Sequence, residues 1–223
     1  MSTLNRSIAQ WIVPWLARLR LSPNQVTLLG LAAGLAAATR FAEGPESWLV
    51  GALWLQLSFI LDNCDGTLAR LQNRTSGLGS WLDTVSDCAV NIGLFYGIGT
   101  GLQRDTGQYI WLVGGLVTAV GVFFSYAMAF AVQVHRRGID AWRHPDPPAG
   151  AEPDSRLVGF RKRAREDFSW IVLAGALAGH LGWLLWCGLG SSFAIGLGNL
   201  RAILRAPEGE PGVLHEDEMP FVG

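Results

Sequence analysis

The chain has 223 residues, of which half are hydrophobic and 16% are charged, and its formal net charge is −1. Together with the positive mean hydropathy, this composition argues against a soluble domain and favours an integral membrane protein. We expect an all-α membrane domain over residues 22–205, preceded by a surface helix over 1–21 and followed by an acidic, disordered tail over 206–223.

The first predicted element is an amphipathic helix over residues 4–19. Its apolar residues share one helical face, and this face includes Trp11 and Trp15. Tryptophan on the apolar face favours a helix that lies in the membrane interface over a soluble amphipathic helix.

A second helix is predicted to begin after Ser22, where three signals agree. Ser22 is a favourable N-cap, Pro23 occupies the first helical position, and Gln25 stands three residues after the cap, as in a capping box. The helix is expected to run to about residue 42. Its Gly30 and Gly34 would permit close contact with a neighbouring helix.

Five further spans would bring the total to six, and they are predicted at about residues 47–64, 79–101, 108–133, 168–187 and 189–205. If both termini are cytoplasmic, 15 of the 17 Lys and Arg residues lie on the inner side. This bias follows the positive-inside rule and predicts a multi-pass protein of the inner or plasma membrane with both termini cytoplasmic. The proline-rich segment 138–167 would be a cytoplasmic loop.

Four aspartates stand where two of these spans meet. Asp62 and Asp65 are three residues apart at the end of one span, and Asp83 and Asp87 are four apart at the start of the next. Each pair shares a helix face, and the short loop predicts antiparallel neighbours, so the four carboxylates should converge. A carboxylate at the centre of a membrane helix costs about 2.5–3.5 kcal/mol, so a cation must compensate the cluster. The alternative is a set of helix-end charges solvated at the interface.

The cluster offers only oxygen ligands, which suit Mg²⁺ or Mn²⁺. Four carboxylates could hold two ions about 3.5–4 Å apart, an arrangement that serves phosphoryl transfer. Gly66, Ala69 and Gly79 would leave room for a ligand, and Arg70 could offer a bidentate fork to a phosphate. Arg70 could instead extend to the lipid headgroups.

The complete pattern, Asp-x2-Asp-Gly-x2-Ala-Arg-x8-Gly-x3-Asp-x3-Asp, resembles the signature of the CDP-alcohol phosphotransferase family. The resemblance includes the Pro23-Asn24-Gln25-Val26-Thr27 start of the first span, the interfacial helix and the six spans, and it covers most of residues 1–135. It implies a metal-dependent membrane phosphotransferase of phospholipid biosynthesis. Such an enzyme moves the phospho-alcohol group of a CDP-alcohol to an acceptor alcohol and releases CMP.

The resemblance also implies a role for each motif residue. Asp62, Asp65 and Asp83 would be metal ligands, and Asp87 would be the general base as well as a metal ligand. Donor contacts are expected from seven residues, namely Asn24, Thr27, Gly66, Ala69, Arg70, Ser76 and Gly79. A homodimer is expected, and a nucleic-acid partner is not.

The substrates and one rival function stay open at this point. CDP-diacylglycerol is the favoured donor, because a site between spans near the cytoplasmic surface lets its acyl chains stay in the bilayer; a water-soluble CDP-alcohol is the alternative. The acceptor would be a small polar alcohol, such as glycerol phosphate, inositol phosphate, inositol or serine. Four arginines either bind a phosphorylated acceptor or anchor the span ends, namely Arg136, Arg137, Arg201 and Arg205. The rival function is a divalent-cation transporter, because intramembrane carboxylates also line ion paths.

Overall fold

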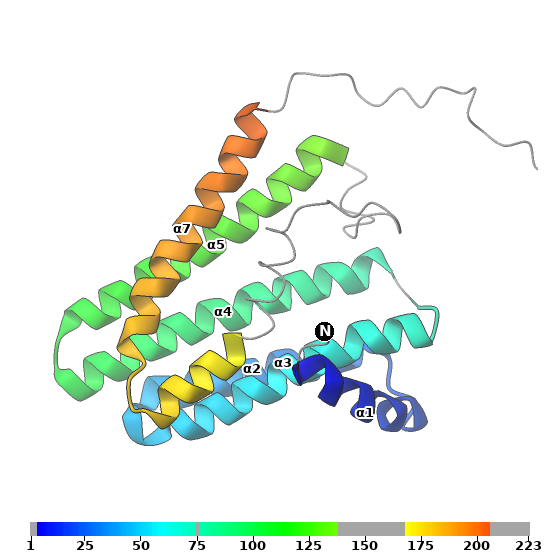
Figure 1. The fold of residues 1–223 in the computed structure, drawn as a ribbon, viewed down its shortest axis with the longest axis horizontal. Helices are drawn as coiled ribbons and strands as arrows, with labels where there is room; N and C mark the ends of the chain where they lie inside the picture. Colours follow the sequence, from blue (N-terminus) through cyan, green and yellow to red (C-terminus); the bar gives the residue numbers. More distant parts are fainter. Residues whose placement is uncertain (1–3, 75, 138–167, 206–223) are drawn as a thin grey trace, which may run out of the picture.

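The computed structural model describes residues 4–74, 76–137 and 168–205 (Figure 1). Their regular structure is entirely helical, which confirms the all-α part of the predicted fold class for these residues. The predicted loop 138–167 and tail 206–223 lie outside the described residues. The elements, in chain order, are α1 (Leu4–Arg18), α2 (Pro23–Glu43), the 3-10 turn η1 (Pro45–Ser47), α3 (Trp48–Leu71), α4 (Gly77–Thr106), α5 (Tyr109–Arg137), a helix at Phe168–Leu177, and α7 (Gly182–Arg205).

Helix α2 lies at the centre of the N-terminal part of the bundle, where it packs against both α3 and α4. Helix α1 packs on α3, while α4 continues to α5, and α5 pairs with α7 (Figure 1). The main hydrophobic core is formed by side chains from these packed helices. Its fully buried members include Phe41, Leu55, Leu94 and Ile98. Because α4 contacts both α2 and α5, it joins the two parts of the fold.

The start of α2 agrees with its prediction. Ser22 is the N-cap: its side chain accepts a hydrogen bond from the Gln25 N–H at 3.3 Å, and its own N–H donates to Gln25 Oε1 at 2.9 Å. The capping box therefore fixes the first turn of α2, with Pro23 at the first helical position. This turn carries two of the predicted donor residues.

Small residues bring α2 and α4 into close contact. A Cβ on Gly97 would lie 2.5 Å from the Ala38 carbonyl oxygen, and one on Gly34 would overlap the Val90 side chain. Only glycine leaves room for such an approach, which is the packing mode of small residues between membrane helices. The predicted contact role of Gly34 is therefore confirmed.

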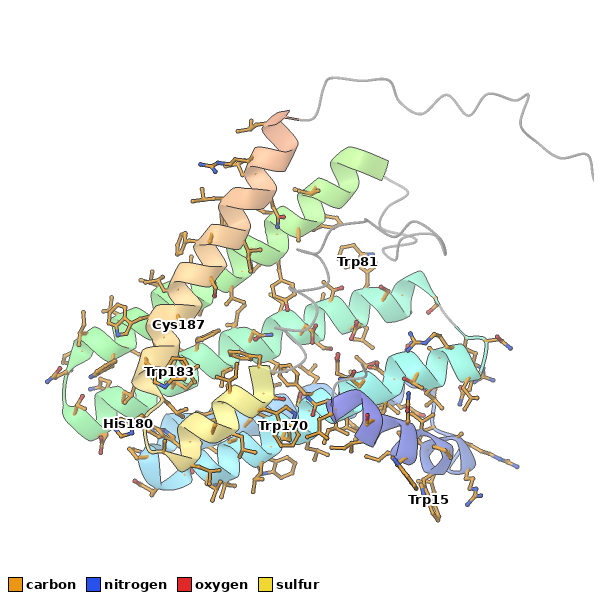
Figure 2. All side chains as sticks on the ribbon, in the orientation of Figure 1. Trp15, Trp81, Trp170, His180, Trp183 and Cys187 are labelled. Atoms are coloured by element: carbon orange, nitrogen blue, oxygen red, sulfur yellow. The ribbon has the colours of Figure 1, made fainter. Side chains whose placement is uncertain are left out.

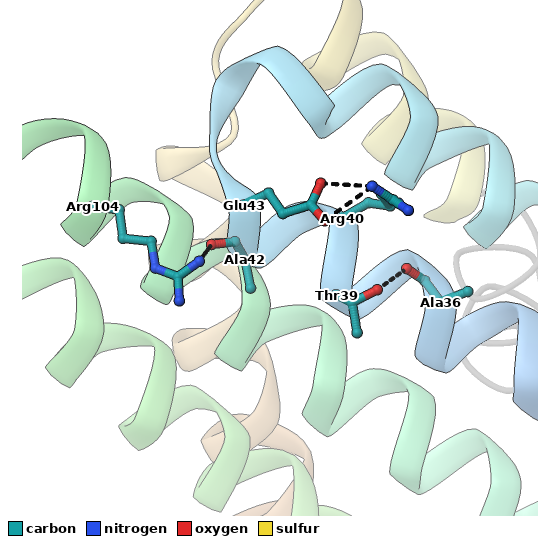
Figure 3. Close-up of polar contacts among 6 residues, drawn as sticks. All are labelled: Ala36, Thr39, Arg40, Ala42, Glu43 and Arg104. Atoms are coloured by element: carbon teal, nitrogen blue, oxygen red, sulfur yellow. Dashed lines mark hydrogen bonds and ion pairs between the residues drawn. The ribbon is translucent and has the colours of Figure 1, made fainter.

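The C-terminal ends of α2 and α4 carry charged side chains, and one of them links the two helices (Figure 3). Arg104 of α4 donates a hydrogen bond to the Ala42 carbonyl oxygen at 2.9 Å, and Arg40 pairs with Glu43 at 3.0 Å. Arg104 thus satisfies a carbonyl that the end of α2 leaves without a helical partner. Arg40 and Arg104 are the two basic residues predicted to lie on the outer side, and the aspartates lie at the opposite ends of the helices.

Helix α1 divides its apolar residues between two directions. Ala9 and Val13 are buried against the bundle, whereas the side chains of Trp11 and Trp15 are 82% and 65% exposed. Trp15 points away from the bundle (Figure 2) and lies under the Arg18 guanidinium, 5.1 Å from the ring centre. The position of α1 in the membrane interface stays a prediction.

A buried polar clamp, formed by Asn5, Gln56 and Ser169, ties α1 to the rest of the fold. The Gln56 amide donates to Asn5 Oδ1 at 2.5 Å, and the Asn5 amide donates to Ser169 Oγ at 3.1 Å. Asn5 and Ser169 are fully buried, and Gln56 is nearly so. The clamp joins α1, α3 and the helix Phe168–Leu177 across an otherwise apolar contact.

Asn5→Ala is expected to lower the free energy of unfolding by about 1–3 kcal/mol, because the Gln56 amide and the Ser169 hydroxyl each lose a buried hydrogen bond. The unfolding midpoint in detergent micelles measures this loss. Gln10→Ala is the matched control, since Gln10 is exposed on the same helix. Equal midpoints for the two variants would contradict a stabilising role of the clamp.

Within the part of the chain that the structure describes, three helices are long and apolar enough to cross a membrane, at Pro23–Glu43, Tyr109–Val132 and Gly182–Arg201. They support a membrane protein. Helices α3 and α4 are long enough too, but the aspartates and other polar residues lower their hydropathy. The total of six spans stays a prediction.

The predicted boundary between the last two spans is wrong. The described helix ends at Leu177 and α7 begins at Gly182, whereas the prediction placed the break after residue 187. Gly179 has a φ of +68°, a left-handed conformation that ends the helix, and the His180 N–H bonds back to the Gly175 carbonyl at 2.9 Å. His180 therefore lies exposed in the connecting turn (Figure 2), not within a span.

Candidate active site

The aspartate motif folds into a group of three carboxylates. Asp62 near the end of α3 and Asp83 and Asp87 near the start of α4 place carboxylate oxygens within 4.8 Å of one another. All three side chains are half-buried. Like charges at this distance repel strongly, so a bound cation would stabilise the group. Three carboxylates form the all-oxygen donor set that suits Mg²⁺ or Mn²⁺.

The backbone arrangement behind this group differs from the prediction. Helices α3 and α4 were expected to be direct neighbours, but α2 is the main neighbour of both. The aspartate side chains therefore converge across a space between α3 and α4, beside the first turns of α2. Helix pairing depends on contacts distant in sequence, so the short loop alone could not reveal this arrangement.

Asp65, the fourth predicted ligand, is held beside the group of three. Its side chain is buried and accepts a hydrogen bond from the Thr27 hydroxyl of α2 at 2.5 Å. The same hydroxyl lies 3.2 Å from the Pro23 carbonyl oxygen. The first turn of α2 thus fixes the orientation of one of the motif aspartates.

Next to the aspartates lies a cleft of about 180 Å³. It is bounded by the first turn of α2, the last turns of α3 and the first turn of α4. Asp65 and Asp83 form its acidic wall. The structure brings all seven predicted donor residues into the walls of this cleft, namely Asn24, Thr27, Gly66, Ala69, Arg70, Ser76 and Gly79. Their roles in binding stay predictions.

Besides its two aspartates, the cleft has two features that favour an anion. Two helices, α2 and α4, begin at its edge, and their N-terminal N–H groups and dipoles favour an anion. The side chains of Arg70 and Arg74 add two positive charges. A phosphate-bearing molecule in the cleft would meet these groups together with the carboxylates of Asp65 and Asp83.

The first turn of α4 depends on two predicted site residues. Ser76 is the N-cap of α4, and its hydroxyl accepts a hydrogen bond from the Gly79 N–H at 3.1 Å. A Cβ on Gly79 would lie only 3.1 Å from Asn24 Oδ1 and 3.2 Å from Ser76 Oγ. Glycine at this position therefore lets the first turns of α2 and α4 approach each other at the cleft.

Sequence reasoning missed Arg74 as a cleft residue and treated it only as a cytoplasmic charge. Asn73 adopts a left-handed φ of +51°, and the Arg74 N–H bonds back to the Ala69 carbonyl at 2.9 Å. This turn ends α3 and returns the chain to the cleft. The signal was an Asn at a helix end followed by Arg, because Asn tolerates the left-handed conformation. Pro23 and Ser80 also line the cleft and were not predicted.

Of the four arginines that could bind a phosphorylated acceptor, the structure describes the side chain of one. Arg201 is exposed on the last turns of α7. The side chains of Arg136, Arg137 and Arg205 lie outside the described residues.

The sequence matches a known family model and several curated proteins. The model of CDP-alcohol phosphatidyltransferase matches residues 20–150. The archaetidylinositol phosphate synthase of Methanothermobacter thermautotrophicus is 32% identical over 178 residues, which cover 78% of this chain and 75% of that protein. The bifunctional IPC transferase and DIPP synthase of Aquifex aeolicus is 32% identical over 122 residues, or 55% of this chain. This chain aligns with 28% of that bifunctional protein.

The fold also matches solved structures. The phosphatidylinositol phosphate synthase of Mycobacterium tuberculosis with CDP-DAG bound superposes with a TM-score of 0.63, covering 93% of this chain and 96% of the other. The same enzyme in complex with manganese and citrate superposes with a TM-score of 0.62, covering 90% of each chain. Both are 20% identical to this chain, so they establish a shared fold.

Proposed function

Because this chain belongs to the CDP-alcohol phosphatidyltransferase family, we propose that it transfers a phosphatidyl group from a CDP-alcohol to an acceptor alcohol and releases CMP, as a step of phospholipid synthesis. The family and enzyme class predicted from the motif are confirmed by the match over residues 20–150. The observation that carries the proposal is the group of three carboxylates, Asp62, Asp83 and Asp87, beside a cleft whose lining combines two aspartates, two arginines and the starts of two helices.

The proposed donor is CDP-diacylglycerol. Its diphosphate is negatively charged, and the cleft can neutralise this charge through Arg70 and Arg74 and through a cation held by the aspartates. Support also comes from the similar fold of a synthase solved with CDP-DAG bound. Helices long enough to cross a membrane would let the acyl chains remain in the bilayer.

The proposed acceptor is inositol phosphate. Among the acceptors considered from the sequence, it agrees with the names of similar proteins, which include an archaetidylinositol phosphate synthase and the phosphatidylinositol phosphate synthase of Cutibacterium acnes. The second of these is 32% identical over 119 residues, or 52% of this chain and 56% of that protein.

The residues of the site have different roles in the proposed reaction. Asp62, Asp65, Asp83 and Asp87 would hold Mg²⁺ or Mn²⁺, in two positions. When bound, the metal neutralises charge on the diphosphate and on the departing CMP. Asp87 takes the proton of the acceptor hydroxyl as this attacks the phosphorus remote from cytidine. Arg70, Arg74 and the N-terminal N–H groups of α2 and α4 orient the diphosphate for the attack.

The membrane placement belongs to the same proposal. The bundle would cross the membrane six times, with both termini and the cleft on the cytoplasmic side and α1 in the interface. The distribution of Lys and Arg supports this orientation. The protein would act as a homodimer.

The decisive experiment supplies purified protein with CDP-diacylglycerol, Mg²⁺ or Mn²⁺, and one acceptor at a time from inositol phosphate, glycerol phosphate, inositol and serine. CMP release that depends on inositol phosphate, with a lipid product of the corresponding mass, is expected. Chelation of the metal with EDTA should reduce CMP release to background, and added Mn²⁺ should restore it. CMP release with a different acceptor would replace only the acceptor assignment, while none with any acceptor would contradict the transferase proposal.

The same preparation separates transfer from the rival transport function. Protein in sealed vesicles is expected to release CMP without carrying Mn²⁺ across the membrane. Mn²⁺ flux in the absence of any CMP release would favour a transporter instead.

A further inference from the structure

A second, smaller cavity lies between α2, α3 and α4, on the side of the aspartates that faces the protein core. It encloses about 20 Å³ and shares Thr27 and Asp65 with the cleft. Its walls also include Asp62, Asp87 and Ser86. The cavity therefore borders the metal-binding carboxylates from the side that faces the protein core.

Ser86 presents a hydroxyl to this cavity that the surrounding protein leaves unpaired. The residue is 6% exposed, and among the described residues no partner lies within hydrogen-bond distance of its Oγ. Its helix usually satisfies such groups internally: the Thr84 hydroxyl donates to the Ser80 carbonyl oxygen at 3.0 Å. Ser86 makes no such bond to its own helix, and it lies in the wall of the cavity.

A buried hydroxyl without a hydrogen bond destabilises the folded protein. Burial without a hydrogen bond costs about 1–3 kcal/mol, whereas an apolar residue of the same size would avoid that cost. The neighbouring carboxylates can each accept several hydrogen bonds. A single group between Ser86 and a carboxylate would satisfy both sides.

The cavity has the size and the polarity for one water molecule. Its volume exceeds the roughly 10–15 Å³ that a water requires, and a buried water needs two to four polar partners. Ser86, Asp62 and Asp65 supply three. The water would donate one hydrogen bond to each carboxylate and accept one from the Ser86 hydroxyl.

We propose that Ser86 is a positioning residue, which holds the carboxylates of Asp62 and Asp65 in their metal-binding orientation through one water bound in this cavity. The inference rests on the proposed metal-dependent function. Groups that orient metal ligands from behind typically change metal affinity by about 10–100-fold when they are removed. Ser86 would thus act on the reaction without touching the substrate.

Mn²⁺ affinity, measured by electron paramagnetic resonance without donor or acceptor, tests the proposal. Ser86→Ala and Ser86→Cys should each raise the Kd for Mn²⁺ by about 10–100-fold, because neither side chain forms a strong hydrogen bond to water. Ser86→Cys nearly preserves the side-chain size and carries the test if the alanine variant fails to fold. Thr84→Ala is the matched control, since it removes a hydroxyl of the same helix that lines neither the cleft nor the cavity. The Kd of this variant for Mn²⁺ should stay within twofold of the wild-type value.

Two further measurements decide the interpretation. A high-resolution structure of the wild type should place a water within hydrogen-bond distance of Ser86 Oγ and of a carboxylate oxygen of Asp62 or Asp65. A dry cavity, or a metal ion there, would overturn the proposal. A purely structural role would lower the unfolding midpoint of Ser86→Cys and leave its Mn²⁺ affinity unchanged, which would also overturn it.

Failure of this inference can be distinguished from failure of the proposed function. If the wild type binds Mn²⁺ with an affinity that depends on Ser86 but releases no CMP, the positioning role stands and the transferase proposal fails. If the wild type releases CMP while the Ser86 variants bind Mn²⁺ as tightly as the wild type, only the positioning role is lost. A wild type that binds no Mn²⁺ contradicts both.

Discussion

Asp87→Asn is expected to lower the rate of CMP release by about 10²–10⁴-fold, because the amide cannot accept the proton of the acceptor hydroxyl. Asparagine preserves the size of the side chain on α4. Steady-state CMP release at saturating CDP-diacylglycerol and inositol phosphate measures the effect. Asp105→Asn provides the control on the same helix, since Asp105 is exposed at the opposite end of α4, and its rate should equal that of the wild type.

Asp87 also lies within 4.8 Å of the carboxylates of Asp62 and Asp83, so its two roles must be separated. The Asp87→Asn rate should be measured over increasing Mn²⁺ until it no longer changes. A deficit that persists at saturating metal supports the role as general base. Full recovery by excess metal would restrict Asp87 to metal binding, and wild-type CMP release at ordinary metal concentration would remove it from both roles.

Arg70→Ala is expected to lower kcat/KM for the CDP-alcohol by about 10–100-fold. The loss corresponds to one hydrogen bond between charged groups, about 1.5–3 kcal/mol, at about 1.4 kcal/mol per factor of ten. Arg70→Lys should recover only part of the loss, because lysine keeps the charge but lacks the planar fork. Initial rates over a range of donor concentrations measure all three proteins.

Arg40→Ala is the control for the loss of a surface arginine. Arg40 pairs with Glu43 at the C-terminal end of α2, whereas the cleft lies at the N-terminal end of this helix. Its removal should therefore leave kcat/KM unchanged. If Arg70→Ala behaves like Arg40→Ala, Arg70 serves as a headgroup anchor, the alternative that the sequence left open.

Much of the candidate site could be predicted because its residues follow fixed local spacings. Asp83 and Asp87 lie one helical turn apart, so any helix through them presents both to the same side. The capping box at Ser22 fixed the start of α2 and thereby the positions of Asn24 and Thr27. Local rules of this kind hold regardless of how the helices pack.

The unpredicted features depend on contacts between distant residues or on single backbone conformations. The placement of α2 between α3 and α4 follows from close packing at Gly34 and Gly97, which a chain with 28 glycines does not reveal in advance. Gly179 ends a helix because its φ is positive, yet it stands in a run of apolar and small residues that resembles a continuous span. The left-handed Asn73 likewise determined the position of Arg74.

The polar clamp has a consequence for biogenesis. Asn5 and Ser169 are 164 residues apart, so at about 5–20 residues per second the ribosome makes the second partner roughly 10–30 s after the first. All four motif aspartates are synthesised before then. The nascent chain can therefore assemble its acidic centre and pack α1 on α3 first, and the hydrogen bond from Asn5 to Ser169 completes the clamp as a late step of maturation.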